Sequence, residues 1–366
     1  MDSREKIRKE LGEDAAVIYG AGLMGQSLCK VLNGTPYDRE IECFIVKSKS
    51  GNPEYISGIR VVSMEEAVQY KHRTIFVALH EKHLKNALSE LSNAGFDRLI
   101  PITFDNDLWA DMRETWINEN GSMPYGVLPS LVSANKHKLH IYVVHSGFDK
   151  ELSENIQNTA YEISIQAGAA LADDIYYETV DNVGDNISDK NKRYCELTVL
   201  YWAWKNDNAD YVGISHYRRK FHLNAADIAA ILSGDIDMVV TVPIININTV
   251  KGQYLKDHDR NDWTILAEAV KKLSPQYTEA LEKVGNGTFY YAYNMFIAKK
   301  DVLNDYCSWL FPILSYCEEK IGNKKDTYQN RYIGFLGERL LTVYIAKHQE
   351  LRVAVAKKHF IEAKEK

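Results

Sequence analysis

A run of basic and aromatic residues, His216-Tyr217-Arg218-Arg219, follows the short apolar segment Tyr211–Ile214. A short apolar segment of this kind is typical of a strand buried in the middle of a sheet. Ligands of open α/β sheets bind beyond the carboxyl ends of the strands, so the basic run lies where a binding site is expected. Arginine stays charged and binds phosphate oxygens through paired N–H donors. The two arginines therefore predict an anion site, and the alternative is the start of a solvated loop.

A glycine-rich segment near the amino end has the spacing of a phosphate-binding turn. The segment Gly20–Gly25 reads GxGxxG between an expected strand, Ala15–Tyr19, and an expected helix that continues through Leu32. Glycines in this context permit a tight turn and let a phosphate approach the amino end of the helix. Lys47 follows the next strand, Ile41–Val46, where a dinucleotide site has an acid, so NAD is not favoured. The candidate nucleotide-binding residues are Gly20, Gly22, Gly25 and Lys47, but a scaffold or regulatory role is favoured over dinucleotide catalysis, because no second catalytic motif accompanies the glycines.

A literal Asp-x-Asp motif occurs at Asp235-Ile236-Asp237. Paired carboxylates of this kind hold a divalent metal that bridges to a donor diphosphate. This motif precedes the apolar run Met238–Val242 and so lies at the amino end of the expected strand. We interpret it as a loop, and a metal is not favoured.

The residues around these motifs predict the elements that position them. Before the basic run, Leu197, Leu200, Tyr201 and Trp204 have the spacing of one apolar helix face, and Ser188 is the expected N-cap. In the first third, strands and helices alternate as in a small parallel doubly wound sheet. Beyond the two strands named above, the expected strands are 60–62, 74–79 and 98–100, and the further helices are 64–70, 82–94 and 106–120. The boundary between domains is expected at the linker after residue 120, which gives domains 1–125 and 126–366.

Long motifs in the last two thirds of the chain resemble a family of uncharacterised domains found in bacterial capsular and exopolysaccharide gene clusters. They read, in order, NISDKNKRYCELTVLYWAWKN, DYVGISHYRRKF, VKGQY, SPQY, YAYNMFIAKK, YCSWLFPIL and RYIGFLGERLLTVYI. The resemblance implies a GT-A-like α/β glycosyltransferase domain that follows the Rossmann-like domain in the sequence. His145 matches the family's histidine near the start of this domain.

The resemblance, together with the chemistry of the side chains, implies a set of site residues. Donor binding is expected from Asn191, Tyr194, Glu196, Tyr217, Arg218, Arg219 and Asn294, with the two arginines on the diphosphate. His216 shapes the donor pocket, and Arg331 and Arg339 bind acceptor or diphosphate. Glu338 is the expected catalytic base, because a helix that starts near Gly337 would favour its ionised form. Structural alternatives stay open for three of these residues: a local cap for Glu196, a strand-edge amide for Asn294, and a Glu338–Arg339 pair.

Composition limits the function classes. The 366 residues carry a formal net charge of −6, which argues against a protein that binds nucleic acid by neutralising phosphates. The five cysteines show no CxxC pairing, so reduced thiols and no zinc site are expected. The amino end lacks the apolar core of a signal peptide, and no apolar run of about 18 residues appears. We expect a cytoplasmic protein whose contact with the inner face of the membrane would be peripheral.

The expected function is transfer of a hexose from a nucleotide-diphosphate sugar to a lipid-linked saccharide acceptor of surface-polysaccharide synthesis. Family resemblance makes a galactose-type donor conceivable. Two alternatives from other classes remain. One is an NAD(P)-dependent sugar-nucleotide oxidoreductase or epimerase built on the amino-terminal glycines, and the other is a sugar-nucleotide-binding module without catalysis.

Overall fold

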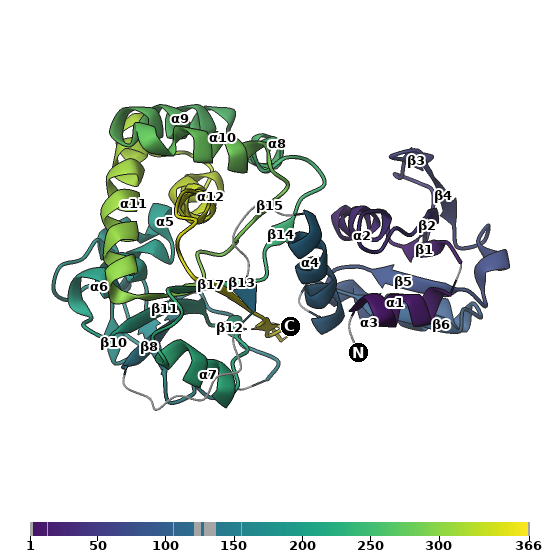
Figure 1. Cartoon of the computed structure of the whole chain (residues 1–366), viewed down its shortest axis with the longest axis horizontal. Coiled ribbons are helices and arrows are strands. Elements are labelled where there is room, and N and C mark those ends of the chain that lie inside the picture. Colours follow the sequence, from purple (N-terminus) through teal and green to yellow (C-terminus); the bar gives the residue numbers. More distant parts are fainter. Residues whose placement is uncertain are drawn as a thin grey trace. The chain divides into compact units, whose positions relative to one another are not determined.

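The computed structural model describes residues 3–12, 14–104, 106–120, 126–127, 137–154 and 156–364. The chain divides into two compact units, Met1–Ser122 and Met123–Lys366. The sequence motifs placed the boundary three residues later. Each unit has its own sheet and its own helices, and each is described separately (Figure 1).

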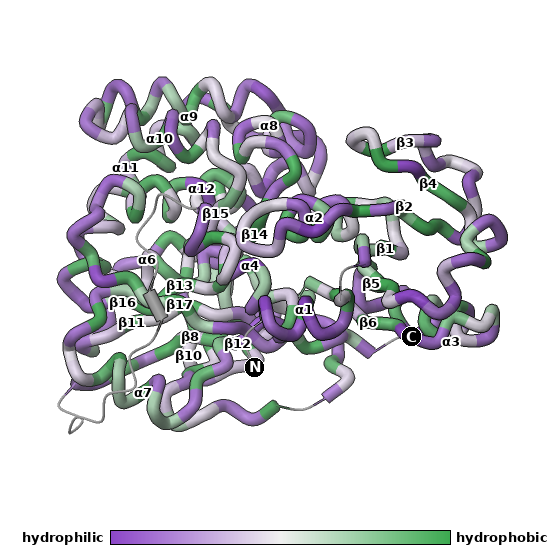
Figure 2. Tube along the Cα trace, turned by 45° about the vertical axis from the view of Figure 1, so that its right-hand side comes forward, coloured by the Kyte–Doolittle hydropathy of each residue, from purple (hydrophilic) through white to green (hydrophobic). Residues whose placement is uncertain are grey.

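The first unit contains a six-stranded sheet in the order β3-β4-β2-β1-β5-β6. All its neighbouring strands pair in parallel except β3 and β4, which are antiparallel. Strands β1 and β5 are buried along their whole length, and Figure 2 shows apolar residues in the strands and a mostly polar helix α1. The strands are β1 (Ala16–Tyr19), β2 (Ile41–Val46), β3 (Tyr55–Ile56), β4 (Ile59–Ser63), β5 (Thr74–Ala78) and β6 (Arg98–Ile102). The helices are α1 (Ser3–Leu11), α2 (Leu23–Asn33), α3 (Glu81–Asn93) and α4 (Asp107–Asn120).

The expected helix over 64–70 is wrong. Only Val68–Tyr70 forms a short 3₁₀ helix, and residues 64–67 form a turn instead. The Glu66 carboxylate accepts a hydrogen bond from the Ser63 backbone N–H and pairs with Lys49. These local contacts compete with the helical hydrogen bonds over the same residues.

The glycine-rich turn has the close backbone approach that the sequence predicts. Gly20 has φ +108°, a conformation that favours glycine. A Cβ on Gly25 would lie 1.8 Å from the Gly20 carbonyl oxygen, whereas a Cβ on Gly22 would meet nothing within 4 Å. Gly25 is therefore required for packing of α2 against the turn, and Gly22 leaves the space beside the helix start open. Lys47 pairs with Glu90 at 2.7 Å on the surface of this unit.

The second unit is built on a ten-stranded sheet whose main path is β10-β9-β8-β11-β16-β13-β17-β7. Neighbours pair in parallel except β16, which is antiparallel to both β11 and β13. The strands on this path are β7 (Gly126–Val127), β8 (Leu139–His145), β9 (Glu162–Gln166), β10 (Thr179–Val180), β11 (Tyr211–His216), β13 (Met238–Thr241), β16 (Phe296–Lys299) and β17 (Val353–Ala356). The sheet also includes β12 (Arg219–Phe221) and β18 (Lys358–Phe360), and β14 (Ile244–Ile245) pairs with β15 (Phe289–Tyr290).

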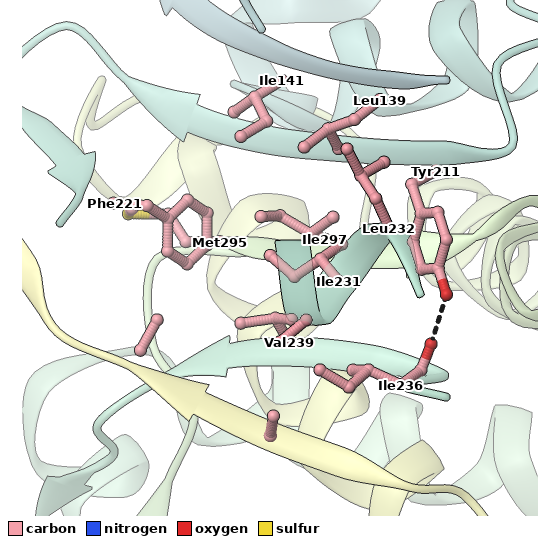
Figure 3. Close-up of a cluster of buried hydrophobic side chains, with 13 residues drawn as sticks. Leu139, Ile141, Tyr211, Phe221, Ile231, Leu232, Ile236, Val239, Met295 and Ile297 are labelled. Atoms are coloured by element: carbon pink, nitrogen blue, oxygen red, sulfur yellow. Dashed lines mark hydrogen bonds between the residues drawn. The ribbon is translucent and has the colours of Figure 1, made fainter. Parts of the chain in front are cut away.

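Helices cover both faces of this sheet (Figure 1). Helices α6 and α11 pack on β11 and β16 on one face, and α7 packs on the other. Figure 3 shows the side chains of α7, β8, β13 and β16 meeting in one apolar cluster, in which the Tyr211 hydroxyl donates to the Ile236 carbonyl at 2.7 Å. The helices are α5 (Asn191–Tyr194), α6 (Leu197–Asn206), α7 (Ala225–Leu232), α8 (Val250–Asp257), α9 (Arg260–Leu273), α10 (Thr278–Asn286), α11 (Lys300–Ile321) and α12 (Tyr332–Lys347). No helix in the described part of the chain is long and apolar enough to cross a membrane.

Two expected helix starts differ from the structure. Ser188 does not cap α6, because its hydroxyl donates to Asp181 within a separate 3₁₀ turn and α6 begins at Leu197. Helix α12 begins at Tyr332 and not near Gly337, so Glu338 lies inside the helix. Glu338 therefore lies beyond the first turn, where the amino end of the helix does not favour its ionised form.

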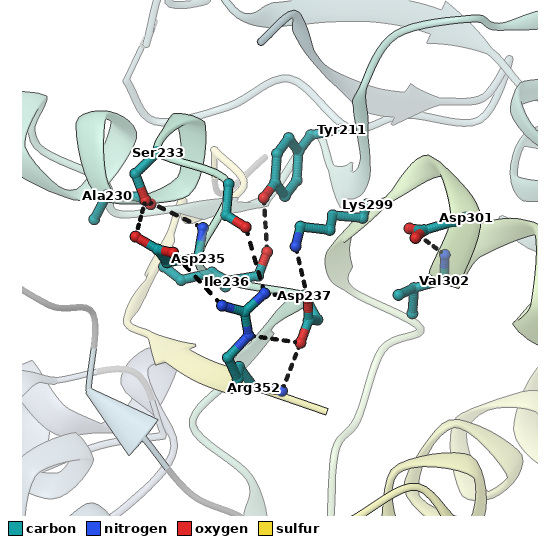
Figure 4. A network of polar contacts seen from close by, with 11 residues as sticks. Tyr211, Ala230, Ser233, Asp235, Ile236, Asp237, Lys299, Asp301, Val302 and Arg352 are labelled. Carbon is teal, nitrogen blue, oxygen red and sulfur yellow. Dashed lines mark hydrogen bonds and ion pairs between the residues drawn. The ribbon is translucent and has the colours of Figure 1, made fainter. Parts of the chain in front are cut away.

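The Asp235-Ile236-Asp237 motif is a loop before β13, as expected, and its second carboxylate is engaged by cations (Figure 4). Asp237 pairs with Lys299 at 2.7 Å and with Arg352 at 2.9 Å. Burial alone would raise the pKa of Asp237, but the hydrogen bonds from Arg352 and Lys299 lower it overall. This network ties β13, β16 and β17 together at the end of the sheet opposite to His216.

Replacing Gly25 by Ala should destabilise the first unit, because the added methyl group would meet backbone that cannot move aside. We expect a loss of about 1–3 kcal/mol in the free energy of unfolding. The matched variant Gly22→Ala adds the same methyl group in open space and should cost less than about 1 kcal/mol. Denaturant unfolding of the full chain, with hydrogen exchange of Ala16–Tyr19, measures both. Equal effects of the two variants would contradict the close approach at Gly25.

Candidate functional site

A cavity of about 460 Å³ lies at the carboxyl ends of β8 and β11. We call it the donor cavity, after the nucleotide sugar that the sequence predicts there. Its walls come from the loop after β8, the junction of α5 and α6, the end of β11 and the residue before α12. They include His145, Asn191, Cys195, Glu196, His216, Tyr217 and Arg331. The structure therefore brings together five of the predicted site residues: Asn191, Glu196, His216, Tyr217 and Arg331.

A buried carboxylate holds one wall of the donor cavity in place. Asp181 is fully buried and accepts hydrogen bonds from the backbone N–H groups of Gly168 and Ala169 at 2.9 and 3.0 Å. The hydroxyls of Ser188 and Thr198 donate to the same carboxylate at 2.5 and 2.6 Å. Four donors compensate for the burial of the charge. The loop after β9 is thereby fixed to the start of α6.

Asn191 is packed tightly in this wall. Gly168 has φ +64°, and a Cβ there would come within 2.7 Å of the Asn191 side chain. The Asn191 amide donates to the Cys195 carbonyl at 2.8 Å and to the Thr198 hydroxyl at 3.0 Å. Asn191 thus shapes the junction of α5 and α6 in addition to lining the donor cavity.

The backbone beside the donor cavity is strained at three positions. Cys195 has φ +52° and ψ −131°, Tyr293 has φ +71° and Asn294 has φ +51°. Residues other than glycine in such conformations cost on the order of 1–3 kcal/mol each and gather at functional sites. Gly334 of α12 leaves room for the Cys195 side chain, because a Cβ there would lie 3.3 Å from the sulfur. The strain therefore marks the place where the α5–α6 junction, β16 and α12 meet.

Glu196 presents a carboxylate oxygen to the donor cavity. The buried Asn294 amide donates to Glu196 Oε1 at 2.6 Å and to the Gly334 carbonyl at 3.2 Å. Glu196 Oε2 has no hydrogen-bond partner among the described residues. One oxygen is thus anchored by protein, and the other is available to a ligand.

Glu338 is engaged by protein through both oxygens. Its Oε1 accepts from the Tyr293 backbone N–H at 3.0 Å, and its Oε2 pairs with Arg339 at 2.6 Å. Burial raises the pKa of Glu338, although Arg339 opposes the shift. Arg339 is itself buried between the rings of Tyr254 and Tyr290, at 5.3 and 4.5 Å. Neither Glu338 nor Arg339 is among the residues that line the donor cavity, and the structural pair that we kept as an alternative is present.

His216 is a neutral hydrogen-bond donor. Its Nε2 lies 2.7 Å from the Tyr293 carbonyl oxygen, which can only accept, so the proton of the neutral ring is on Nε2. Burial lowers the pKa of His216, and Arg219 and Arg331 oppose its protonation as well. Its Nδ1 is therefore a hydrogen-bond acceptor at the end of β11.

Two cations line the donor cavity, Lys192 and Arg331, and Arg331 contacts the α5–α6 junction. The Arg331 Nε donates to the Cys195 sulfur at 3.2 Å. Arg218 and Arg219 instead flank one ring, with their guanidinium carbons 4.8 and 5.1 Å from the centre of Phe360. Arg218 also donates to the Ile361 carbonyl, whereas the guanidinium carbon of Arg219 also lies 4.6 Å from the centre of the Tyr293 ring.

The remaining predicted residues lie partly in the donor cavity and partly elsewhere. Tyr217 lines the donor cavity beside His145, whose ring stacks on Tyr177 at 4.2 Å. Tyr194 is buried and donates to Glu318 at 3.0 Å, so it does not reach the cavity. The amino-terminal candidates Gly20, Gly22, Gly25 and Lys47 belong to the other unit.

Some cavity residues were missed from sequence. Lys192 and Cys195 lie within the motif NKRYCEL, so its spacing alone could have pointed to them. Phe148 and Asp149 lie in the loop after β8, which matches no quoted motif. Among the described residues, no group of three His, Cys, Asp or Glu side chains is arranged to hold a metal ion.

The whole chain was compared with known proteins. Residues 141–349 match the family described as DUF4422, a domain of unknown function. The structure is similar to the apo structure of WbbM, named as a bifunctional glycosyltransferase, with a TM-score of 0.55 and 28% sequence identity. The match covers 61% of this chain and 45% of that protein, so this chain spans less than half of its length. No curated protein matches the chain.

These matches confirm the predicted fold class, a Rossmann-like sheet together with a GT-A-like α/β domain. The similarity to WbbM relates this chain to a glycosyltransferase structure, but it does not identify the transferred sugar. The family match covers more than half of the 366 residues. The chain therefore belongs to the DUF4422 family.

Proposed function

We propose that this protein is a glycosyltransferase that moves a hexosyl group from a nucleotide-diphosphate sugar to a saccharide acceptor. The observation that carries the proposal is the pairing of an anchored carboxylate, Glu196, with a cation, Arg331, in one cavity beyond the ends of β8 and β11. Such a cavity suits a donor with a charged leaving group. The likeness to WbbM supports the same class of reaction.

Donor binding is assigned by charge and shape. Arg331 is the first candidate for the diphosphate, because guanidinium groups bind phosphate oxygens through charge-assisted hydrogen bonds. The sequence predicts Arg218 and Arg219 for this role. They lie at the β11–β12 turn, and we propose them as a second source of positive charge. Tyr217 and His145 offer ring faces for the nucleoside, and His216 Nδ1 is an acceptor for a hydroxyl.

The transfer step follows from the free oxygen of Glu196. This carboxylate takes the proton from an acceptor hydroxyl, whose oxygen forms a bond to the anomeric carbon of the donor. The bond from that carbon to the diphosphate oxygen breaks with its electron pair, and the nucleoside diphosphate leaves. Positive side chains stabilise the charge that develops on it. The sequence-based choice of base, Glu338, is the second candidate for this role.

The finer assignments also remain proposals. A galactose-type donor, a lipid-linked acceptor of surface-polysaccharide synthesis and action at the inner face of the membrane are proposed from the sequence motifs. The glycine-rich turn of the first unit is proposed as a scaffold, with nucleotide binding at Gly20, Gly22 and Lys47 as the alternative.

Glu196→Gln should slow release of nucleoside diphosphate by about 10²- to 10⁴-fold, because the amide cannot take a proton. Glu338→Gln should slow it less than about 10-fold, because the amide oxygen can still accept from the Tyr293 N–H. Turnover is measured with a panel of nucleotide sugars, with and without saccharide acceptors. The reverse order of effects would make Glu338 the base. No release from any sugar by the unmodified protein would favour the binding module.

Arg331→Ala should weaken donor binding by about 10- to 100-fold, the loss expected for a hydrogen bond to a charged group. Arg218→Ala should have a smaller effect, because that side chain packs on Phe360 and donates to the Ile361 carbonyl. Calorimetry with nucleotide sugars measures both, and Arg260→Ala, at an exposed position on α9, controls for loss of charge. If Arg218→Ala had the larger effect, the β11–β12 turn would hold the diphosphate.

Millimolar EDTA should leave the rate within about twofold of its starting value, if protein cations take the role of a metal on the leaving group. The two carboxylates of the Asp-x-Asp motif support this proposal, because Asp237 is held by Lys299 and Arg352. Loss of activity in EDTA with recovery in manganese would overturn it.

A further inference from the structure

Three aromatic rings lie together where α8 ends and α12 begins. His258 stacks on Phe335 with ring centres 4.2 Å apart and on Tyr328 at 6.1 Å. Tyr328 and Phe335 are 5.2 Å apart. We call these three residues the aromatic platform. Ordinary packing would bury such a cluster, yet Tyr328 is 54% exposed and the other two rings are half-buried.

The aromatic platform is continuous with the donor cavity through one side chain. Arg331 lines the cavity and donates to the Cys195 sulfur, and its guanidinium carbon lies 5.7 Å from the centre of the Phe335 ring. Phe335 lies one helical turn after Arg331 and nearly one turn before Glu338, on the same helix. A molecule on the platform would therefore adjoin a molecule in the cavity.

Hydrogen bonds fix the loop that presents Tyr328. Lys324 pairs with the fully buried Asp262 at 2.6 Å, and its backbone N–H donates to the Asn330 side chain at 2.9 Å. The Gln329 backbone N–H donates to Asp326 at 2.7 Å, and its amide donates to the Asp257 carbonyl at 3.0 Å. The exposed ring is thus held in place on both sides.

The platform is uncharged at neutral pH. Burial, together with a smaller effect of Arg339, lowers the pKa of His258 to about 4. Neutral rings that are rigid and exposed on one side present an apolar surface next to polar groups, which suits one face of a sugar ring better than it suits an ion.

We propose that the aromatic platform binds a sugar ring of the acceptor saccharide, with Tyr328 as its main contact surface. The inference rests on the proposed transferase function and adds the location of the acceptor. A sugar stacked on Tyr328 would lie beside Arg331, so its hydroxyl could face the anomeric carbon of a donor in the cavity. Tyr328 is then an acceptor-binding residue and takes no part in proton transfer.

The test uses the full chain and three probes of known chemistry: octyl glycosides of galactose, glucose and N-acetylglucosamine, below their micelle concentrations. Saturation-transfer NMR reports separately on the sugar-ring protons and on the alkyl protons of each probe. We expect ring-proton saturation with at least one probe, roughly 3- to 10-fold weaker in Tyr328→Ala. Tyr328→Phe should restore it. Tyr55→Ala controls for loss of an exposed ring, because Tyr55 is 56% exposed in the other unit.

Each outcome decides the proposal. Ring saturation that depends on Tyr328 supports it. Saturation confined to alkyl protons would mean an apolar docking surface and would overturn it, as would equal signals in Tyr328→Ala and the unmodified protein, or no ring saturation with any of the probes. Thermal unfolding of Tyr328→Ala excludes loss of fold as the cause. Release of nucleoside diphosphate by the unmodified protein is measured separately, so failure of the transferase function and failure of the platform are distinguishable.

Discussion

The buried carboxylate of Asp181 is the interaction on which the site depends. An isolated charge in a protein interior is strongly unfavourable, so this carboxylate persists only because four donors from three segments converge on it. The convergence fixes the loop after β9 against the start of α6 and so sets the position of Asn191. Without these hydrogen bonds, the strained backbone at Cys195 would not be held in its conformation.

The two carboxylates at the centre of the site have different environments and therefore different chemistry. Glu338 is enclosed by Arg339 and the Tyr293 backbone, so its charge serves the fold of the turn before β16. Glu196 is held through one oxygen only, which leaves the other oxygen for a ligand. Burial is the main cause that lowers the pKa of His216, and two arginines act in the same direction, whereas Glu196 and the hydrogen bond to the Tyr293 carbonyl raise it. Of these two carboxylates, Glu196 therefore presents an oxygen without a hydrogen-bond partner among the described residues, whereas Glu338 presents none.

The helices and strands could be predicted from local sequence patterns, whereas the site depends on contacts between residues far apart in the sequence. The apolar spacing of α6 and the apolar run of β11 could be read directly, because each depends on neighbouring residues. The contact between Arg331 and Cys195 joins residues 136 positions apart, and no local pattern reports it. The start of α12 was misplaced because glycines usually indicate a break. Gly334 and Gly337 are instead helical, since Cys195 and Leu197 pack where their side chains would be.

Helix α12 and the residue before it, Arg331, link the donor cavity to the aromatic platform. The helix begins directly after Arg331, which lines the donor cavity. Its first two turns carry Phe335 of the aromatic platform and Glu338, which accepts a hydrogen bond from the Tyr293 backbone. The glycines let the side chains of Cys195 and Leu197 at the α5–α6 junction pack directly against the backbone of this helix. Helix α12 is continuous from Tyr332 to Lys347, so its residues move together. Under the proposed function, a shift of its first turn toward the donor cavity would also move Phe335 of the aromatic platform, where the acceptor sugar is proposed to bind.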